Sequence, residues 1–174
     1  MPLDPDRILN PHFAPCLFIV TGQSGIGKTT YCAGIVRAAQ ARKRTVGGIL
    51  CPAVFRDDIK IGIDLVNLAT GERRQFAQLT NPDSQAATVG HWRMNPNTLA
   101  WGNHILAESP DGDVLIIDEL GPLEFNKQQG FVAGLRRLDA RQYRTALVVI
   151  RPSLVAVALE RWPDAHNVNL EETP

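Results

Sequence analysis

Residues 22–29, GQSGIGKT, match the pattern GxxxxGK[ST], in which a glycine-rich loop binds phosphate groups. Glycines let the backbone wrap closely, so that consecutive N–H groups point into a hollow of the size of a phosphate. We expect Lys28 to reach the β- and γ-phosphates of a nucleotide, and the Thr29 hydroxyl to bind Mg²⁺. The predicted nucleotide-binding residues are Gly22, Gln23, Ser24, Gly25, Ile26, Gly27, Lys28, Thr29 and Thr30.

A pair of acidic residues, Asp118 and Glu119, follows the apolar run of residues 114–117. A buried strand of this kind places carboxylates at the carboxyl edge of a sheet, where the glycine-rich loop also lies. Asp118 would hold Mg²⁺ through water, because this ion keeps much of its hydration shell in proteins. Glu119 would polarise the water that attacks the γ-phosphate. The sequence thus predicts a metal site at Thr29 and Asp118, with Glu119 as the general base.

Arg151 directly follows another apolar run, residues 146–150, and we expect it at the same sheet edge. It would either neutralise charge that grows in the transition state or remain a surface arginine before a proline. The predicted catalytic residues are therefore Lys28, Glu119 and Arg151. Arg56, or an arginine of a second subunit, is the alternative to Arg151. Glu124, in the loop after Glu119, could bind a water or orient a partner residue, but a surface charge without a role in the chemistry is slightly favoured.

Apolar runs and helical patterns that alternate along the chain must position these residues. Buried strands are predicted at residues 16–20, 46–50, 114–117 and 146–150, with a last strand at 167–170. Helices are predicted from Lys28 to about residue 44, from Asn95-Pro96, after a capping box of Asn126 and Gln129, and over residues 153–162. The alternation indicates an α/β fold, a three-layer sandwich with a central, mainly parallel sheet.

Two segments depart from this alternation. Residues 1–15 contain four prolines, so we expect an extended lead-in. Residues 59–65 alternate apolar with polar or small side chains, residues 70–71 offer a turn, and residues 74–79 could return. This pattern predicts an antiparallel β-hairpin inserted over residues 57–80, and residues 80–95 are expected to form a loop.

Composition restricts the class of protein. The chain has 174 residues with 18 Lys plus Arg and 18 Asp plus Glu, so its formal net charge is zero. Such a balance is not typical of proteins that coat nucleic acid or an anionic membrane. The length suits a single domain, 1–174, and three cysteines without ligand spacing favour a reducing cytoplasm. The predicted partner is a nucleoside triphosphate such as ATP or GTP, and a protein partner or self-association stays open.

Taken together, these motifs resemble a family of small nucleoside-triphosphatases known as cancer-related or thermophile-type nucleoside-triphosphatase. The resemblance runs from about Cys16 to about Leu170. It rests on the glycine-rich loop, on Gly47-Gly48 with Pro52, Val54 and Arg56, on residues 60–65, and on residues 117–124, IDELGPLE. The last segment is similar to the Asp-Glu-x-Gly-x-x-Glu signature of the family and is the most specific of the four.

The resemblance implies a P-loop NTPase fold of the class with an additional central strand and a catalytic glutamate. It implies hydrolysis of nucleoside triphosphates with loose base preference, and it implies that strand 146–150 lies between strands 16–20 and 114–117. The chain departs from the family in two places. Asp57-Asp58 stand where glycines are common, and residues 171–174, EETP, replace the common Asn-Arg-Asp ending.

Two other functions use a glycine-rich loop of this kind. A small-molecule or nucleotide kinase needs an acceptor pocket and usually an arginine-bearing lid, and the sequence shows no lid segment with clustered arginines. A nucleotide-dependent switch or cofactor-insertion helper would hydrolyse slowly, with the hairpin and residues 80–95 as its partner surface. Because Glu119 suits a water better than an organic acceptor, the leading prediction is Mg²⁺-dependent hydrolysis of nucleoside 5′-triphosphates to the diphosphate and phosphate.

Overall fold

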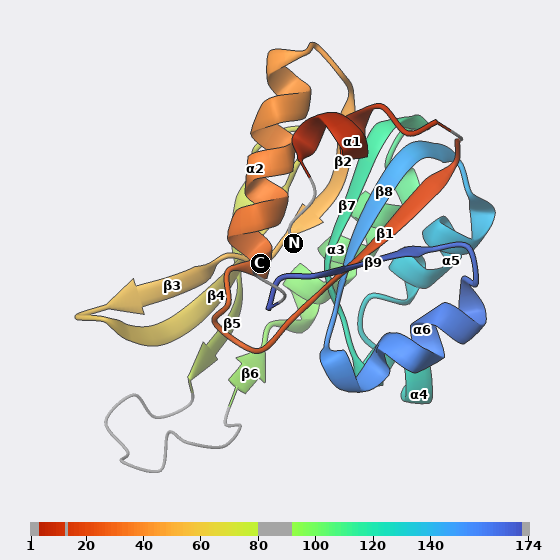
Figure 1. The fold of residues 1–174 in the computed structure, drawn as a ribbon. Helices are drawn as coiled ribbons and strands as arrows, with labels where there is room; N and C mark the ends of the chain where they lie inside the picture. The colour runs from red at the N-terminus through yellow and green to blue at the C-terminus, as the bar shows by residue number, and fades with distance from the viewer. Residues whose placement is uncertain (1–3, 13, 80–91, 172–174) are drawn as a thin grey trace.

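A mixed sheet forms the centre of the protein in the computed structural model, which describes residues 4–12, 14–79 and 92–171. Over these residues the sheet has nine strands in the order β6-β5-β4-β2-β7-β8-β1-β9, with β3 paired to β4 beside this path (Figure 1). The strands are β1 (Cys16–Thr21), β2 (Val46–Leu50), β3 (Ala53–Arg56), β4 (Ile59–Asn67), β5 (Arg73–Leu79), β6 (Trp92–Met94), β7 (Gly112–Leu120), β8 (Tyr143–Ile150) and β9 (His166–Asn169). The helices are α1 (Pro5–Leu9), α2 (Lys28–Ala41), α3 (Pro96–Glu108), α4 (Pro122–Lys127), α5 (Val132–Ala140), the 3₁₀ turn η1 (Pro152–Leu154) and α6 (Val155–Arg161).

The parallel half of the sheet consists of β2, β7, β8, β1 and β9. β8 pairs in parallel with β1 on one side, where Phe18 lies opposite Leu147, and with β7 on the other, where Ile116 lies opposite Leu147. This order confirms the strand position that the family resemblance implied. Because the carboxyl ends of parallel strands meet at one edge, the residues that follow β1, β7 and β8 come together there.

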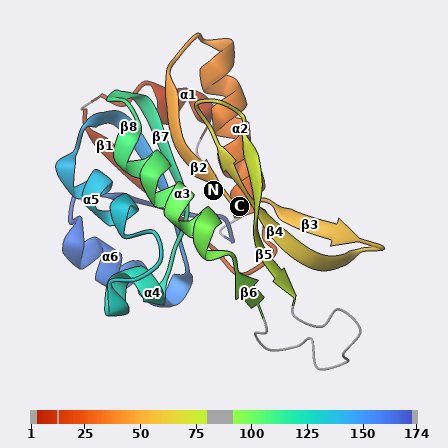
Figure 2. The same ribbon diagram turned by 180° about the vertical axis from the view of Figure 1, so that it is seen from behind.

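Helices cover both faces of the sheet, so the predicted three-layer α/β fold is confirmed. α1 and α2 lie on one face, and α3, α5 and α6 lie on the other (Figures 1 and 2). Alternate residues of β1 enter the two separate cores: Phe18 packs in the core that contains Ile35 of α2, and Ile19 packs in the core that contains Leu106 and Leu138. A strand buried on both faces explains why the sequence shows an unbroken apolar run there.

An antiparallel half, β3 to β6, projects from the body of the molecule (Figure 1). The predicted hairpin is confirmed as β4 and β5, and β4 joins the main sheet because Ile49 of β2 pairs with Asn67. β3 and β6 were not predicted. The loop expected over residues 80–95 is wrong at residues 92–94, which form β6. Residues 80–91 lie outside the described residues. The outer end leaves Phe55 and Ile59 largely exposed.

The turn between β3 and β4 explains one departure from the family. Asp57 and Asp58 form a two-residue connection, and both have positive φ angles, 48° and 60°. Two-residue hairpin turns with positive φ at both positions favour glycine, while aspartate and asparagine tolerate the same conformation. The backbone geometry of this turn is therefore compatible with either pair of residues.

The extended lead-in expected over residues 1–15 is wrong at residues 5–9, which form helix α1, and residues 1–3 and 13 lie outside the described residues. Proline favours the first position of a helix, where its missing N–H has no partner to lose, and Pro5 occupies that end of α1. The Asp4 side chain accepts a hydrogen bond from the Asp6 N–H and caps the helix. Ile8 is fully buried, and the Thr145 hydroxyl donates to its carbonyl at 3.0 Å. The lead-in therefore closes the core beside β8.

The expected capping box of Asn126 and Gln129 is also wrong. Asn126 lies inside α4, which begins after Gly121, and Gln128 ends that helix in the left-handed conformation. α5 then begins at Val132, six residues after Asn126. The predicted start at Asn95-Pro96 is confirmed, because the Asn95 side chain accepts hydrogen bonds from the first turn of α3. The two predictions differ because Asn95 is followed by a proline, which favours the first position of a helix, whereas Asn126 is not.

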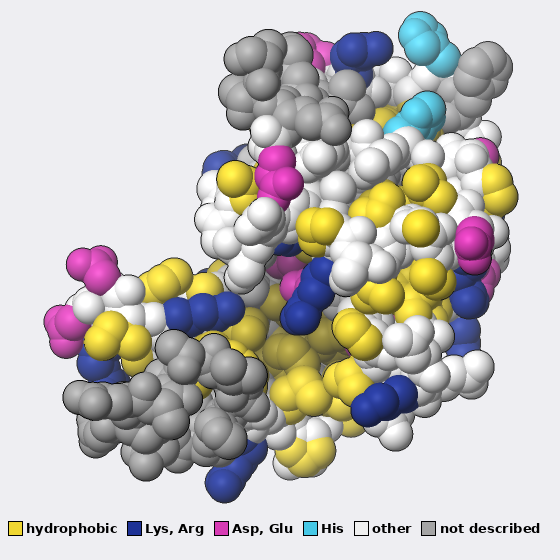
Figure 3. Space-filling model, turned by 60° about the horizontal axis from the view of Figure 1, so that its bottom comes forward, with side chains coloured by type: hydrophobic (Ala, Val, Ile, Leu, Met, Phe, Trp, Pro, Cys, Tyr) yellow, Lys and Arg dark blue, Asp and Glu magenta, His cyan; other side chains and the backbone are white. Residues whose placement is uncertain are grey.

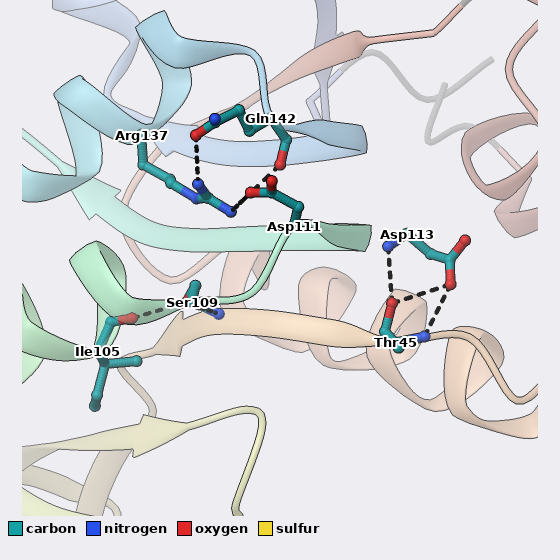
Figure 4. Close-up of polar contacts among 8 residues, drawn as sticks. Thr45, Ile105, Ser109, Asp111, Asp113, Arg137 and Gln142 are labelled. Carbon is teal, nitrogen blue, oxygen red and sulfur yellow. Dashed lines mark hydrogen bonds and ion pairs between the residues drawn. The ribbon is translucent and has the colours of Figure 1, made fainter.

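Polar contacts at the amino ends of β2 and β7 fix the register of these strands (Figure 4). Thr45 donates its N–H and its hydroxyl to one Asp113 oxygen, both at 3.0 Å, and receives the Asp113 N–H at 2.9 Å. The hydrogen bond from the Thr45 N–H is the largest cause that lowers the pKa of Asp113 below its usual range. Gly48 of β2 has a φ of +96°, and a Cβ there would lie 1.9 Å from the Ile116 carbonyl oxygen. This close approach requires glycine.

Among the described residues, no helix combines the length and the apolar character needed to cross a membrane.

Candidate functional site

The glycine-rich loop, residues 22–27, connects the carboxyl end of β1 to α2. Gly22, Gly25 and Gly27 have φ angles of +143°, +84° and +98°, a region that side chains rarely allow. A Cβ on Gly22 would also lie 2.9 Å from the Ile26 side chain. The sequence therefore folds into a tight loop because glycine occupies each position that needs it.

Lys28, the first residue of α2, folds back over this loop. Its Nζ donates to the carbonyl oxygens of Gly22 at 2.6 Å and Gln23 at 2.7 Å. The ammonium group is thus fixed at the mouth of the loop, together with the N-terminus of a 14-residue helix whose dipole favours anions. Thr29 follows in the first helical turn, and Thr30 is exposed beside it.

Asp118 lies next to the first turn of α2, as the sequence predicted. Its side chain is 3% exposed and accepts hydrogen bonds from the Thr29 side chain and from the Cys51 N–H, the latter at 3.1 Å. Burial is the main cause that raises the pKa of Asp118, and the charge of Glu119 adds to it, although the two hydrogen bonds and the charge of Lys28 act in the opposite direction. A buried carboxylate in contact with a hydroxyl offers the hard oxygen donors that Mg²⁺ prefers, so the residues present fit this ion.

Glu119 and Arg151, two residues predicted to act separately, form an ion pair. Arg151 Nε lies 2.6 Å from Glu119 Oε1, with side-chain exposures of 63% and 33%. Glu119 belongs to β7 and Arg151 follows β8, and these strands are neighbours in the sheet. The contact between the two side chains follows from the pairing of β7 with β8, which the local sequence pattern does not show.

Glu124 is buried in the first turn of α4, and both of its carboxylate oxygens are occupied. Oε2 accepts the Gly121 N–H and Oε1 accepts the Phe131 N–H, each at 2.7 Å. Gly130 leaves room for this carboxylate, because a Cβ there would lie 1.9 Å from Glu124 Oε1. The expectation of a surface charge is therefore wrong, because Glu124 is 5% exposed. Its carboxylate instead fastens the segment that contains α4.

Two residues at the site were not expected from the sequence. Cys51 donates its N–H to Asp118, and burial raises the pKa of its thiol well above the usual range. Glu171 accepts the Gln23 N–H at 2.7 Å. The position of Glu171 just beyond β9 could have indicated this contact, because β9 pairs in parallel with β1 and both strands end near the loop. Arg56, the alternative arginine, ends β3 in the projecting hairpin and is exposed.

The carboxyl edge of the sheet faces an open surface. Figure 3 shows that this side is hollowed between the body and the projecting strands, with Lys and Arg side chains around a mainly hydrophobic floor. Ile26 of the glycine-rich loop is 45% exposed. A ligand with phosphate groups could therefore enter from solvent.

The chain matches the protein family described as NTPase over residues 17–172. It is 34% identical over 123 residues to "Nucleoside-triphosphatase THEP1" of Archaeoglobus fulgidus, a match that covers 71% of this chain and 70% of the relative. It is 31% identical over 151 residues to the protein of the same name from Methanopyrus kandleri, covering 84% of this chain and 81% of the relative.

Two solved structures share the fold. A human cancer-related nucleoside triphosphatase, solved in solution, has a TM-score of 0.67 and covers 88% of both chains at 22% identity. The crystal structure of THEP1 from the hyperthermophile Aquifex aeolicus has a TM-score of 0.62 at the same identity, covering 88% of this chain and 89% of that chain. Since the family match spans most of the chain and the relatives agree with it, the chain belongs to the NTPase family of nucleoside-triphosphatases.

Proposed function

We propose that this protein hydrolyses nucleoside 5′-triphosphates, ATP and GTP among them, to the diphosphate and phosphate in a Mg²⁺-dependent reaction. One observation carries the proposal: the Thr29 hydroxyl contacts the buried Asp118 carboxylate directly beside Lys28 and the glycine-rich loop. Residues 22–29 would act as the Walker A element, and Asp118 would act as the Walker B aspartate. Three free cysteines support a cytoplasmic location, and we treat residues 1–174 as one domain.

Binding of the triphosphate would rest on the loop and the start of α2. N–H groups of the loop would surround the β-phosphate, and Lys28 already lies at the loop mouth through its bonds to Gly22 and Gln23. An ammonium group so placed can contact β- and γ-phosphate oxygens without a large movement. Thr30, in the first turn of α2, lies close enough in sequence to assist at the α-phosphate.

Thr29 and Asp118 would hold the Mg²⁺ ion, which when bound neutralises charge on the phosphate oxygens. Desolvation favours the protonated form of Asp118, and a cation beside it favours the ionised form. Asp118 would thus serve as an ionised ligand once nucleotide and cation are present. The Cys51 N–H keeps its carboxylate oriented toward Thr29.

Glu119 would accept the proton of the attacking water. In the present structure one of its oxygens is bound to Arg151, but an ion pair this exposed contributes only about 0–1 kcal/mol. A triphosphate can therefore attract Arg151 away at little cost. Arg151 would then contact the γ-phosphate and stabilise charge in the transition state, while Glu119 orients the water.

Phosphate release from ATP, GTP, CTP and UTP, each with and without Mg²⁺, tests this proposal. We expect multiple turnovers without any partner protein and no turnover in EDTA. Release only after addition of a partner would identify a switch, and transfer of phosphate to an added acceptor would identify a kinase. Either result would contradict the proposed hydrolase.

A further inference from the structure

We propose that Glu171, just beyond β9, is a positioning residue for the nucleotide site. Its carboxylate holds the first turn of the glycine-rich loop in the conformation that binds phosphate. The inference goes beyond the roles given to Lys28, Asp118 and Glu119, because Glu171 touches the loop backbone rather than the reacting atoms.

The peptide groups of Gly22 and Gln23 are held from two directions. Glu171 Oε1 accepts the Gln23 N–H at 2.7 Å. Lys28 Nζ donates to the carbonyl oxygens of the same two residues at 2.6 and 2.7 Å. A glycine-rich loop has many accessible conformations, so bonds to both the N–H and the carbonyl of one residue restrict it strongly.

The position of Glu171 is itself fixed by the sheet. β9 runs parallel to β1, with Asn169 opposite Thr21, and the Leu170 N–H donates to the Thr21 carbonyl at 3.0 Å. The Glu171 N–H then donates to the Asn169 side chain at 3.1 Å. The carboxylate therefore approaches the loop from a strand end that is anchored two residues earlier.

Two effects of this carboxylate on nucleotide binding oppose each other. Its hydrogen bond orders the loop, and bonds from N–H groups to charged acceptors are about twice as strong as neutral ones. Its negative charge repels a triphosphate, but both Glu171 and Gln23 are exposed, so water and salt screen that repulsion. The ordering of the loop should therefore outweigh the charge repulsion. We expect the nucleotide to bind more weakly when the acceptor oxygen of Glu171 is removed.

Three variants separate these effects. Glu171→Ala removes the acceptor, Glu171→Gln keeps an acceptor oxygen without the charge, and Glu108→Ala removes an exposed glutamate near the opposite edge of the sheet. For each variant, KM and kcat are measured with Mg²⁺-ATP, the Kd for ADP is measured by calorimetry, and the unfolding midpoint is recorded.

We expect Glu171→Ala to raise KM and the Kd for ADP by about 3–10-fold, the value of one partly exposed hydrogen bond to a charged group. Glu171→Gln should restore most of the affinity, and Glu108→Ala should match the wild type. Unchanged affinity in Glu171→Ala, tighter binding in both Glu171 variants, or equal weakening in both would overturn the proposal. Absence of turnover in the wild type would instead contradict the hydrolase function, since ADP affinity still reports on the loop.

Discussion

The substitution Glu119→Gln should separate nucleotide binding from hydrolysis. The amide keeps the shape of the side chain and an oxygen that can contact Arg151, but it cannot accept a proton from water. The existing ion pair is exposed at 63% on Arg151 and 33% on Glu119, so its loss should lower the free energy of unfolding by less than about 1 kcal/mol. The variant should therefore fold normally, and any loss of turnover reports on chemistry.

Turnover of this variant should fall by about 10²–10⁴-fold, the usual contribution of a general base, which corresponds to about 2.7–5.4 kcal/mol in the activation barrier. Affinity for Mg²⁺-ATP should stay within a few-fold of the wild type. Phosphate release under single-turnover conditions gives the chemical rate, and calorimetric titration gives the affinity.

Glu124→Gln is the matched control, because it makes the same chemical change five residues away. Both oxygens of Glu124 accept backbone N–H groups, so an amide places a donor against a donor and leaves a buried polar group unpaired. We expect a loss of about 1–3 kcal/mol in the free energy of unfolding and a much smaller loss of turnover per folded molecule. Near-normal turnover in a folded Glu119→Gln variant would refute the role given to Glu119.

Three further predictions concern Arg151, Asp113 and the β3–β4 turn. Arg151→Ala should lower kcat more than it weakens binding of Mg²⁺-ATP, and an unchanged kcat would leave Arg151 a surface residue. Because the folded-state pKa of Asp113 is lowered, its contribution to stability is present above the ordinary value of 3.8 and is lost as the pH falls through the folded-state value. The difference in the free energy of unfolding between wild type and Asp113→Asn, measured by urea denaturation, should therefore be present at pH 6 and shrink below pH 3.8; a constant difference would contradict the contact with Thr45. Asp58→Gly should raise the free energy of unfolding by up to about 1 kcal/mol in the same assay, because Asp58 has a φ of 60°, and a loss of stability would contradict the turn geometry.

The sequence predicted the parts of the site that depend on strand ends. Residues that follow β1 and the acidic residues near the end of β7 must meet at one edge of a parallel sheet, so the contact of Thr29 with Asp118 could be anticipated. Buried strands such as β8 could also be predicted, because a strand that is covered on both faces consists of consecutive apolar residues.

Contacts between side chains of separate strands could not be predicted in this way. The pair of Glu119 and Arg151 requires the strand order and the side-chain directions, and neither is contained in the local pattern. The bond from Gln23 to Glu171 depends on the pairing of β9 with β1.

Helix α1 was missed for a different reason. Proline was counted as a helix breaker, although Pro5 occupies the first position, where it is tolerated. The Asn126 capping box failed because Asn126 lies inside α4, whereas the next helix, α5, begins only at Val132. The Phe131 N–H, just before α5, donates to Glu124, a contact that the local sequence pattern does not contain.

We propose that triphosphates are hydrolysed at the glycine-rich loop, where Lys28 bonds to Gly22 and Gln23. Steady-state phosphate release from Mg²⁺-ATP by the wild type and by Lys28→Ala, under identical conditions, tests it most directly. In the proposed function Lys28 supplies the fixed positive charge that reaches the β- and γ-phosphate oxygens, so its removal should abolish both tight binding and release. We expect multiple turnovers for the wild type and no release above the buffer blank for Lys28→Ala; equal rates for the two proteins would show that hydrolysis takes place elsewhere.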